Sequence, residues 1–229
     1  MNLFSLFTKG GAVMYLILLC SIIALYIIVE RVMALRRARE IPGGFARQLR
    51  DFIRQGDVKS ALLYAARYDI PMARVIKAGL AKIHRGYRRV QQAMEDQGRA
   101  EIGVLERYMG VLATVAGVAP LLGFLGTVIG IAIAFEEIAA QGGQVSADVL
   151  ADGISQALYT TVFGLIVGIP AFAAYNYLNG MIRGVVGKLE NQAREIFDVI
   201  EEELPAESRS KASISAAETE LQNERGKTL

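Results

Sequence analysis

The sequence predicts an all-α integral membrane protein with three transmembrane helices. Three stretches contain no charged residue, and each is long enough to cross the hydrocarbon core as a helix, for which about 18 to 20 apolar residues suffice. These stretches are Gly10–Val29, Tyr108–Phe135 and Gly153–Ile182. Hydrophobic residues make up 53% of the 229 residues and charged residues only 21%. This concentration of uncharged residues excludes an ordinary soluble enzyme.

The placement of basic residues predicts the orientation of the spans. Of the 25 Lys and Arg residues, 17 lie between Arg31 and Arg107 and seven lie from Arg183 onward. The segment Glu136–Asp152 has four acids and no basic residue. Lys and Arg near the ends of spans stay in the cytoplasm, so we expect an outside N-terminus and an inside C-terminus. The first span is expected to be an uncleaved anchor, because its basic charge follows it rather than precedes it.

Proline and glycine residues, which interrupt helices, divide the rest of the chain into segments. Ile41-Pro42-Gly43-Gly44 marks the exit from the first span, and Pro71 breaks a later amphipathic stretch. From about Arg88 there is no breaker apart from single glycines, so one continuous helix is expected to enter the second span. The predicted segments are an external N-terminus (1–9), a first span (10–30), a cytoplasmic helical region (31–107), a second span (108–135), an external loop (136–152), a third span (153–182), a cytoplasmic helix (183–204) and a tail (205–229).

The third span is expected to continue into the cytoplasm as the same helix. After it, apolar residues recur in alternating steps of four and three, which is a heptad pattern. About two and a half heptads are present, which favours packing in a helical bundle over an isolated coiled coil. Pro205 ends the pattern, and the polar tail after it is expected to be disordered. The seam consists of Ile182, Val186, Leu189, Ala193, Ile196 and Ile200.

Small residues in the second and third spans predict close helix packing. Gly126 and Gly130 form a GxxxG pair, and such pairs let membrane helices approach closely. Helix packing alone is the plainer interpretation of this pattern, and the pattern by itself favours it. The candidate packing residues are Gly123, Gly126, Gly130, Gly164, Gly168, Pro120 and Pro170.

The few polar residues within these spans help to decide between helix packing alone and a polar path through the membrane. A single threonine such as Thr127 can satisfy its hydroxyl on the backbone carbonyl one turn back. The side-chain amide of Gln156 cannot form all of its hydrogen bonds within its own helix, so it should face protein or water rather than lipid. Asp152, Gln156 and Thr160 share one helix face and predict a polar track into the bilayer. No carboxylate lies deep in any span, so a proton path would need a titratable group from a partner, or a chain of waters.

The sequence gives no sign of a catalytic or metal site. His84 is the single histidine and Cys20 the single cysteine, so no His/Cys cluster is available for a metal or for nucleophilic catalysis. There is no phosphate-binding loop, and the net charge of +2 suggests no nucleic-acid partner. We therefore expect no cofactor and no enzymatic activity.

Two membrane motifs resemble a known family. These are PLLGFLGTVIGIAIAF at 120–135 and GISQALYTTVFGLIVGIPAFAAYN at 153–176, accompanied by Glu30-Arg31 at the exit of the first span. They are similar to the MotA/TolQ/ExbB proton-channel subunits, and closest to the ExbB/TolQ branch, because the MotA branch usually has four spans. The resemblance implies a homopentameric ring in the bacterial inner membrane, with a periplasmic N-terminus and with the second and third spans lining a central pore. It also implies a single-span partner resembling ExbD or TolR with a membrane aspartate, and a periplasm-spanning protein resembling TonB or TolA.

The resemblance assigns roles to three residues. Thr127 and Thr161 match the pore-facing threonines of the family motifs, and Gln156 stands where many ExbB and TolQ sequences have glutamate. This departure removes the ring's own titratable group and leaves the partner's aspartate as the main candidate proton carrier. The leading hypothesis is a proton-channel ring subunit, the stator of a motor that drives outer-membrane transport. The alternatives are a structural membrane scaffold and, less favoured, a small-molecule permease component. TonB-type or Tol-type output, and H⁺ or Na⁺ as the ion, both stay open.

Overall fold

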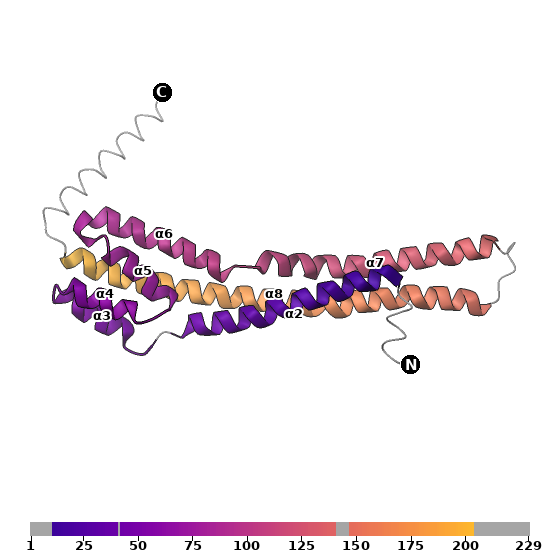
Figure 1. Cartoon of the computed structure of the whole chain (residues 1–229), viewed down its shortest axis with the longest axis horizontal. Helices are drawn as coiled ribbons and strands as arrows, with labels where there is room; N and C mark the ends of the chain where they lie inside the picture. The colour runs from indigo at the N-terminus through magenta and orange to yellow at the C-terminus, as the bar shows by residue number, and fades with distance from the viewer. Residues whose placement is uncertain (1–10, 41, 141–146, 204–229) are drawn as a thin grey trace, which may run out of the picture. The chain divides into compact units, whose positions relative to one another are not determined.

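The computed structural model describes residues 11–40, 42–140 and 147–203; within them, the side chains at 147–150, 152, 156 and 203 are not described. Every regular element in these ranges is a helix, which confirms the predicted all-α class. Three helical segments are long and apolar enough to cross a membrane, namely Gly11–Arg39, Tyr87–Ala140 and Gly153–Glu202. The elements are α2 (Gly11–Arg39), α3 (Phe45–Arg54), α4 (Val58–Ala66), α5 (Pro71–Leu80), the 3₁₀ turn η1 (Ile83–Arg85), α6 (Tyr87–Leu105), α7 (Met109–Ala140) and α8 (Ala147–Glu203) (Figure 1).

The described residues form two compact units. The span unit comprises residues 11–33, 106–140 and 147–181, and the bundle unit comprises residues 34–105, without 41, and 182–203. Helices α2 and α8 each contribute one part to each unit. The predicted N-terminal segment 1–9 and the predicted tail 205–229 lie outside the described residues. Both α7 and α8 extend into the segment predicted as an external loop, since α7 ends at Ala140 and α8 begins at Ala147.

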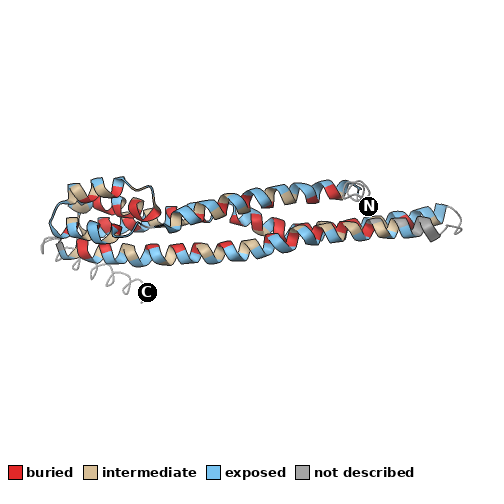
Figure 2. Cartoon of the chain, turned by 90° about the horizontal axis from the view of Figure 1, so that it is seen from below, coloured by how far each residue is buried: buried red, intermediate tan, exposed pale blue. Residues whose placement is uncertain are grey.

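The bundle unit is held by large apolar and aromatic side chains. Phe45, Leu49 and Ile53 recur every four residues on α3 and are fully buried. The ring of Phe45 lies 5.6 Å from that of Tyr64 and 5.2 Å from that of Tyr68, both within the range of favourable aromatic pairs. Buried residues line the inward faces of the short helices (Figure 2). The bundle unit therefore has its own hydrophobic core, to which α8 contributes Leu189, Ile196, Val199 and Ile200.

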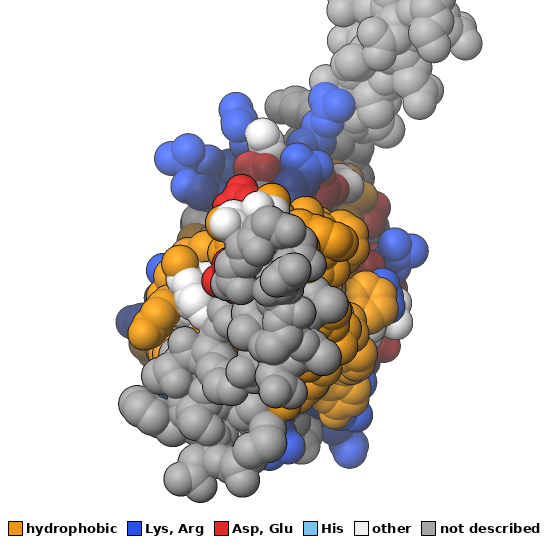
Figure 3. Space-filling model, turned by 90° about the vertical axis from the view of Figure 1, so that its right-hand side faces the viewer, with side chains coloured by type: hydrophobic (Ala, Val, Ile, Leu, Met, Phe, Trp, Pro, Cys, Tyr) orange, Lys and Arg blue, Asp and Glu red, His pale blue; other side chains and the backbone are white. Residues whose placement is uncertain are grey.

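Large apolar side chains of the span unit are mostly on its surface. Leu25, Leu121, Phe124 and Ile169 are all more than 60% exposed. Hydrophobic side chains also make up much of the described surface that is visible in the space-filling view (Figure 3). Water would penalise so much apolar surface, so this unit is suited to contact with lipid tails or with other apolar helices.

Helix α8 is continuous over 57 residues, about 86 Å at the α-helical rise. This confirms the expected continuation of the third span, although the helix begins six residues earlier than the predicted start at Gly153. Pro170 lies within it without ending it. Along the predicted seam, Ile182, Leu189, Ile196 and Ile200 are buried, while Val186 and Ala193 are half-buried.

The expected continuous helix from Arg88 into the second span is wrong. Helix α6 ends at Leu105 and α7 begins at Met109, with a turn between them in which Tyr108 has φ 64°. Gly103 and Gly110 lie on either side of this break, but the turn residues 106–108 include no glycine or proline. The ring of Tyr108 lies 4.6 Å from the guanidinium carbon of Arg107 and 5.9 Å from that of Arg31. These cation–π contacts help to offset the cost of about 1–2 kcal/mol of a left-handed non-glycine residue.

Candidate functional site

The candidate site lies where α7 and α8 pack against each other in the span unit. A Cβ atom built on Gly123 would lie 2.8 Å from the carbonyl oxygen of Thr160, and one on Gly164 would lie 2.7 Å from that of Ala119. Real Cβ atoms do not approach backbone oxygens so closely, so these positions require glycine. The absence of side chains brings the two backbones into contact, as small residues do between membrane helices.

The other predicted packing residues divide into two groups. A Cβ atom on Gly126 would meet the side chain of Thr160, and one on Gly130 would lie 2.9 Å from Cβ of Ala157. Gly168 faces the ring of Pro120. Pro170 is exposed, however, and the structure does not bring it into this contact.

Three threonine hydroxyls lie together at the centre of the contact. Thr127 Oγ1 is within hydrogen-bonding distance of Thr161 Oγ1, 3.0 Å from the carbonyl oxygen of Ala157 and 3.3 Å from that of Gly123. Thr161 donates to the carbonyl of Gly123 at 3.1 Å. A hydroxyl has a single proton, so each threonine chooses among these acceptors. The result is a neutral network whose members can exchange donor and acceptor roles.

Burial separates the three threonines. Thr160 is 1% exposed, and its hydroxyl donates either to Ala157 O at 2.7 Å or to Gly123 O at 3.1 Å. Thr127 and Thr161 are half-buried, so part of each side chain reaches the surface of the unit. The expected polar track through Thr160 is therefore wrong at that residue, because Thr160 is closed between the two helices. The side chains of Asp152 and Gln156 lie outside the described residues.

A charged group lies at the end of the charge-free part of α2. Arg31 is only 4% exposed and forms a two-bonded ion pair with the neighbouring Glu30. Its guanidinium also faces the ring of Tyr108, which follows α6. Sequence reasoning noticed Glu30-Arg31 but had no signal for Tyr108, whose role depends on the turn that the sequence did not predict.

The bundle unit contains a buried carboxylate that sequence reasoning missed. Glu101 is 4% exposed and accepts two hydrogen bonds from Arg74, each 2.7 Å long, and one from Gln97 at 2.8 Å. Arg74 also pairs with the exposed Asp69. The hydrogen bonds from Arg74 to Glu101 raise the pKa of Arg74 above its ordinary value, against the opposing effect of burial. The hydrogen bonds between Arg74 and Glu101 link α5 to α6, so we assign these residues a structural role.

The bundle unit also has a groove of about 600 Å³ between α6 and α8, with Met94 and Phe197 among its apolar lining and Arg99 and Asp198 among its charged lining. His84 is exposed in η1, and Cys20 is half-buried in α2. Within the described ranges, no group of three His, Cys, Asp or Glu residues is placed to hold a metal ion.

The sequence profile of the MotA/TolQ/ExbB proton channel family matches residues 68–191. This range is more than half of the chain and contains the whole α7–α8 contact. The chain belongs to this family. The predicted resemblance is thus confirmed, and the threonines and glycines of the site lie within the family's matched range rather than in a segment peculiar to this chain.

Individual members of the family are similar over most of the chain. The biopolymer transport protein ExbB of Neisseria meningitidis is 31% identical over 215 residues, which cover 86% of this chain and 96% of that protein. An ExbB homolog of Methanothermobacter thermautotrophicus is 31% identical over 186 residues, which cover 81% of this chain and 66% of that protein. ExbB of Xanthomonas campestris is 37% identical over 109 residues, 48% of this chain and 43% of that protein. These similarities, with the apolar helices, indicate an ExbB-like membrane protein with a role in transport.

Proposed function

We propose that this chain is the proton-channel ring subunit of an inner-membrane motor of the ExbB–ExbD or TolQ–TolR kind. Copies of the chain surround an axial pore lined by α7 and α8. Basic residues near the span ends, among them Arg36, Arg107 and Arg183, support a cytoplasmic location for the bundle unit and a periplasmic N-terminus. The family membership and the similarity to ExbB proteins support the ring and the transport role.

The hydroxyl pair of Thr127 and Thr161 is the observation that carries this proposal. Hydroxyls can donate or accept without carrying charge. A protonated carboxyl group moving past them could exchange hydrogen bonds rather than lose them, which lowers the cost of its passage. An ion path through these uncharged spans therefore offers hydroxyl groups that can hydrogen-bond to a protonated carboxyl group. The path itself contains no charged side chain.

The titratable group must then come from a partner. The charge-free parts of the three spans contain no Asp or Glu, and a proton relay through a membrane normally uses such a group. A single-span protein with a membrane aspartate, resembling ExbD or TolR, supplies it in this proposal. Each proton that crosses a potential of 100 mV releases about 2.3 kcal/mol. This energy drives motion that a TonB-like or TolA-like protein carries across the periplasm.

Gln156 is proposed to line the wet mouth of the pore. A Gln156→Glu substitution should then be tolerated, since water can solvate a carboxylate there. Proton uptake and ring assembly of this variant test the position. Loss of assembly would place the side chain between helices and contradict the assignment.

A structural scaffold is the second candidate, and one observation favours it. Each of the three threonine hydroxyls has a backbone carbonyl acceptor within 3.3 Å. In the scaffold candidate, these satisfied hydroxyls serve only to hold α7 against α8. The two candidates differ in what they predict when a hydroxyl is removed without a change in shape.

Proton uptake by vesicles separates the two candidates. The chain and its single-span partner are reconstituted together, a membrane potential is applied, and internal pH is followed with a dye. Thr127→Val and Thr161→Val should each lower the uptake rate about tenfold to a hundredfold, the equivalent of one unmet polar group. Thr114→Val is the matched control on α7, because Thr114 is exposed and bonds only to Gly110 of its own helix. Unchanged uptake in both test variants, with the ring intact, would favour the scaffold.

A further inference from the structure

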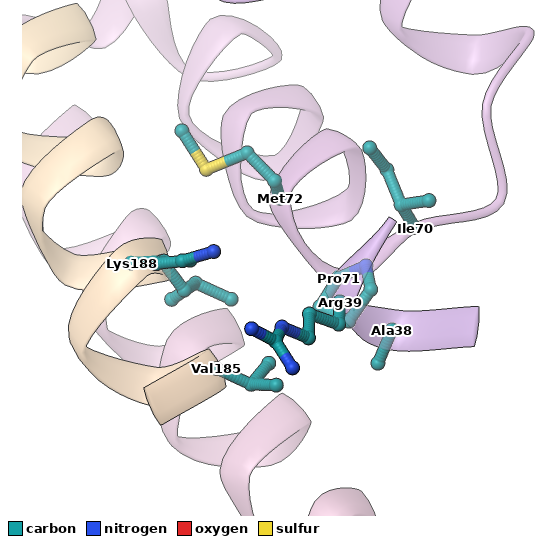
Figure 4. Close-up of a pocket in the computed structure, with 8 residues that line it drawn as sticks. Ala38, Arg39, Ile70, Pro71, Met72, Val185 and Lys188 are labelled. Atoms are coloured by element: carbon teal, nitrogen blue, oxygen red, sulfur yellow. The ribbon is translucent and has the colours of Figure 1, made fainter. Parts of the chain in front are cut away.

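The groove between α6 and α8 is large enough to take the side chains of another segment of protein. Its volume is about 600 Å³, within the range of about 300–1,000 Å³ that is typical of ligand pockets. The hollow beside the first turn of α5, which Arg39 and Lys188 line, has a volume of about 10 Å³ (Figure 4). That hollow has room for about one water molecule. Of these two hollows, only the groove can therefore hold part of a polypeptide.

The apolar lining of the groove is partly open to solvent. Ile102 of α6 and Ala193 and Phe197 of α8 are half-buried. The buried side chains of Met94 and Leu189 complete this apolar lining. Because water reaches part of it, an apolar group placed in the groove would be stabilised by leaving water as well.

Exposed charges border the groove on both sides. On α8, Asp198, Arg194 and Glu190 follow one another at intervals of four residues, so their charges are negative, positive and negative. On α6, the charged residues are Glu95 and Arg99. None of these five side chains forms an ion pair within the described part of the chain. A partner with the opposite order of charges would complement the α8 side of the groove.

The residues that follow α8 in the sequence have the pattern of a short amphipathic helix. Ile214, Ala217 and Leu221 are spaced i, i+3 and i+7, which is the spacing of one helical face. We call these three residues the apolar stripe. Ser210 precedes this segment and Gly226 follows it, and these are residue types favoured at the start and just past the end of a helix.

The charges beside the apolar stripe match those of the groove. Lys211, Glu218 and Arg225 recur every seven residues and so lie on one side of a helix, next to the stripe. Their order is positive, negative and positive, the reverse of the order from Asp198 to Glu190 on α8. The intervals are about 10 Å in the segment and about 6 Å on α8, a difference that long Lys and Arg side chains can span.

The connection to α8 is long enough to bring this segment to the groove. The described part of α8 ends at Glu203, five residues beyond Asp198, which is about 7 Å along a helix. Residues 204–210 can extend over about 23 Å, so the chain can turn back at this end of the groove. A helix over 211–225 would be about 22 Å long, while the α6 side of the groove, from Gln91 to Ile102, is about 16 Å long.

We propose that residues 211–225 occupy the groove between α6 and α8 of the same chain as a helix. The apolar stripe packs on Ala193 and Phe197, and Lys211 lies near Asp198. The segment has too few apolar side chains to fold alone, so its helix forms as it docks. The short connection raises its local concentration to roughly millimolar, so that a weak contact is enough. The inference concerns the bundle unit alone and does not depend on ion conduction.

Disulfide formation in the full-length protein tests this contact. Cys20→Ser removes the native thiol, and Ala193→Cys and Ala217→Cys are then introduced together. A disulfide needs Cα atoms within about 7 Å of each other, so docking should favour it. Under mild oxidation this pair should join within one chain roughly tenfold faster than Leu63→Cys with Ala217→Cys, the equivalent of one buried apolar side chain. Leu63 is the matched control, because it is exposed on α4 of the same unit and does not line the groove.

Substitutions in the segment test the apolar stripe. Ile214→Asp with Leu221→Asp should slow the disulfide between positions 193 and 217 about tenfold, because it removes apolar side chains from the contact. Ala212→Asp with Ala216→Asp adds the same two charges on the opposite side of the helix and should leave the rate unchanged. Equal rates in these two double variants would overturn the proposal.

Charge reversal tests the proposed alignment. Asp198→Lys should slow the disulfide about twofold to fivefold, as expected for an exposed ion pair, and Lys211→Asp in the same chain should restore the rate. A failure to restore it would overturn this pairing.

The masses of the products identify the occupant of the groove. A disulfide between two chains, seen as a doubled mass on a non-reducing gel, would make a second copy the occupant and overturn the proposal. Equal rates for the Ala193→Cys and Leu63→Cys pairs would overturn it as well. Circular dichroism of each variant verifies that the fold is kept.

Discussion

The two units of this chain are held together by opposite means. In the span unit, α7 and α8 meet through glycines and threonine hydroxyls, while large apolar side chains such as Phe124 remain outside. In the bundle unit, Phe45 and other large side chains fill the interior. Burial of apolar groups stabilises helices in water but not in lipid, where close approach and hydrogen bonds must do so. The contrast indicates which solvent each unit is built for.

The largest expected effect is on the bundle core. Phe45→Ala removes a fully buried ring that contacts two tyrosines, and should lower the free energy of unfolding of this unit by about 3–5 kcal/mol. Phe124→Ala removes an exposed ring of the span unit and should leave the fold unchanged. Hydrogen exchange of each unit in detergent measures both effects. Similar losses of protection in the two variants would remove the distinction between the units.

The next effect concerns the α7–α8 contact. Gly123→Ala places a methyl group 2.8 Å from a backbone oxygen and should destabilise the span unit by about 1–3 kcal/mol, as overpacking does. Gly117→Ala on the same helix meets nothing within 4 Å and should be neutral or slightly stabilising. The thermal midpoint of the purified protein gives the comparison. If both substitutions had the same effect, close backbone approach would not be what holds this contact.

The smallest expected quantity is the coupling energy between two polar residues within the bundle, Arg74 and Glu101. Arg74→Met leaves the buried Glu101 with only Gln97 as a partner, and should cost about 1–3 kcal/mol. Glu101→Gln removes the buried charge, so in this background Arg74→Met should lower the free energy of unfolding by less. A double-mutant cycle measured by denaturant unfolding yields the coupling, for which we expect about 1–2 kcal/mol because Arg74 is partly exposed. A coupling near zero would mean that the pair adds nothing to the fold.

Sequence patterns predicted long-range features of the fold better than its breaks. The charge-free stretches and the heptad steps after Ile182 indicated the long helices, because length and periodicity are carried by many residues. The turn before α7 depends on how the ring of Tyr108 meets Arg31 and Arg107. No local residue type announces that arrangement, so the sequence suggested an unbroken helix.

The candidate site was predictable in composition but not in detail. The glycine spacing indicated a close helix contact. Adjacent residues within this contact nevertheless differ in burial, since Thr160 is buried between the helices and Thr161 is half-buried. One residue is a rotation of about 100° on a helix, and no sequence pattern resolved that rotation here. Arg74 and Glu101 are 27 positions apart in the sequence, so no helical periodicity could predict that they pair.

Water access to Thr161 tests the central claim most directly. Cys20 is the single cysteine, so Cys20→Ser gives a background in which Thr161→Cys and Thr160→Cys can be compared. The thiols are treated with a charged, water-soluble reagent in membranes that contain the assembled protein and its partner. Our account predicts that Thr161→Cys is labelled and that the buried Thr160→Cys is not. Labelling of Thr161→Cys only by a lipid-soluble reagent would contradict the placement of this residue on an ion path.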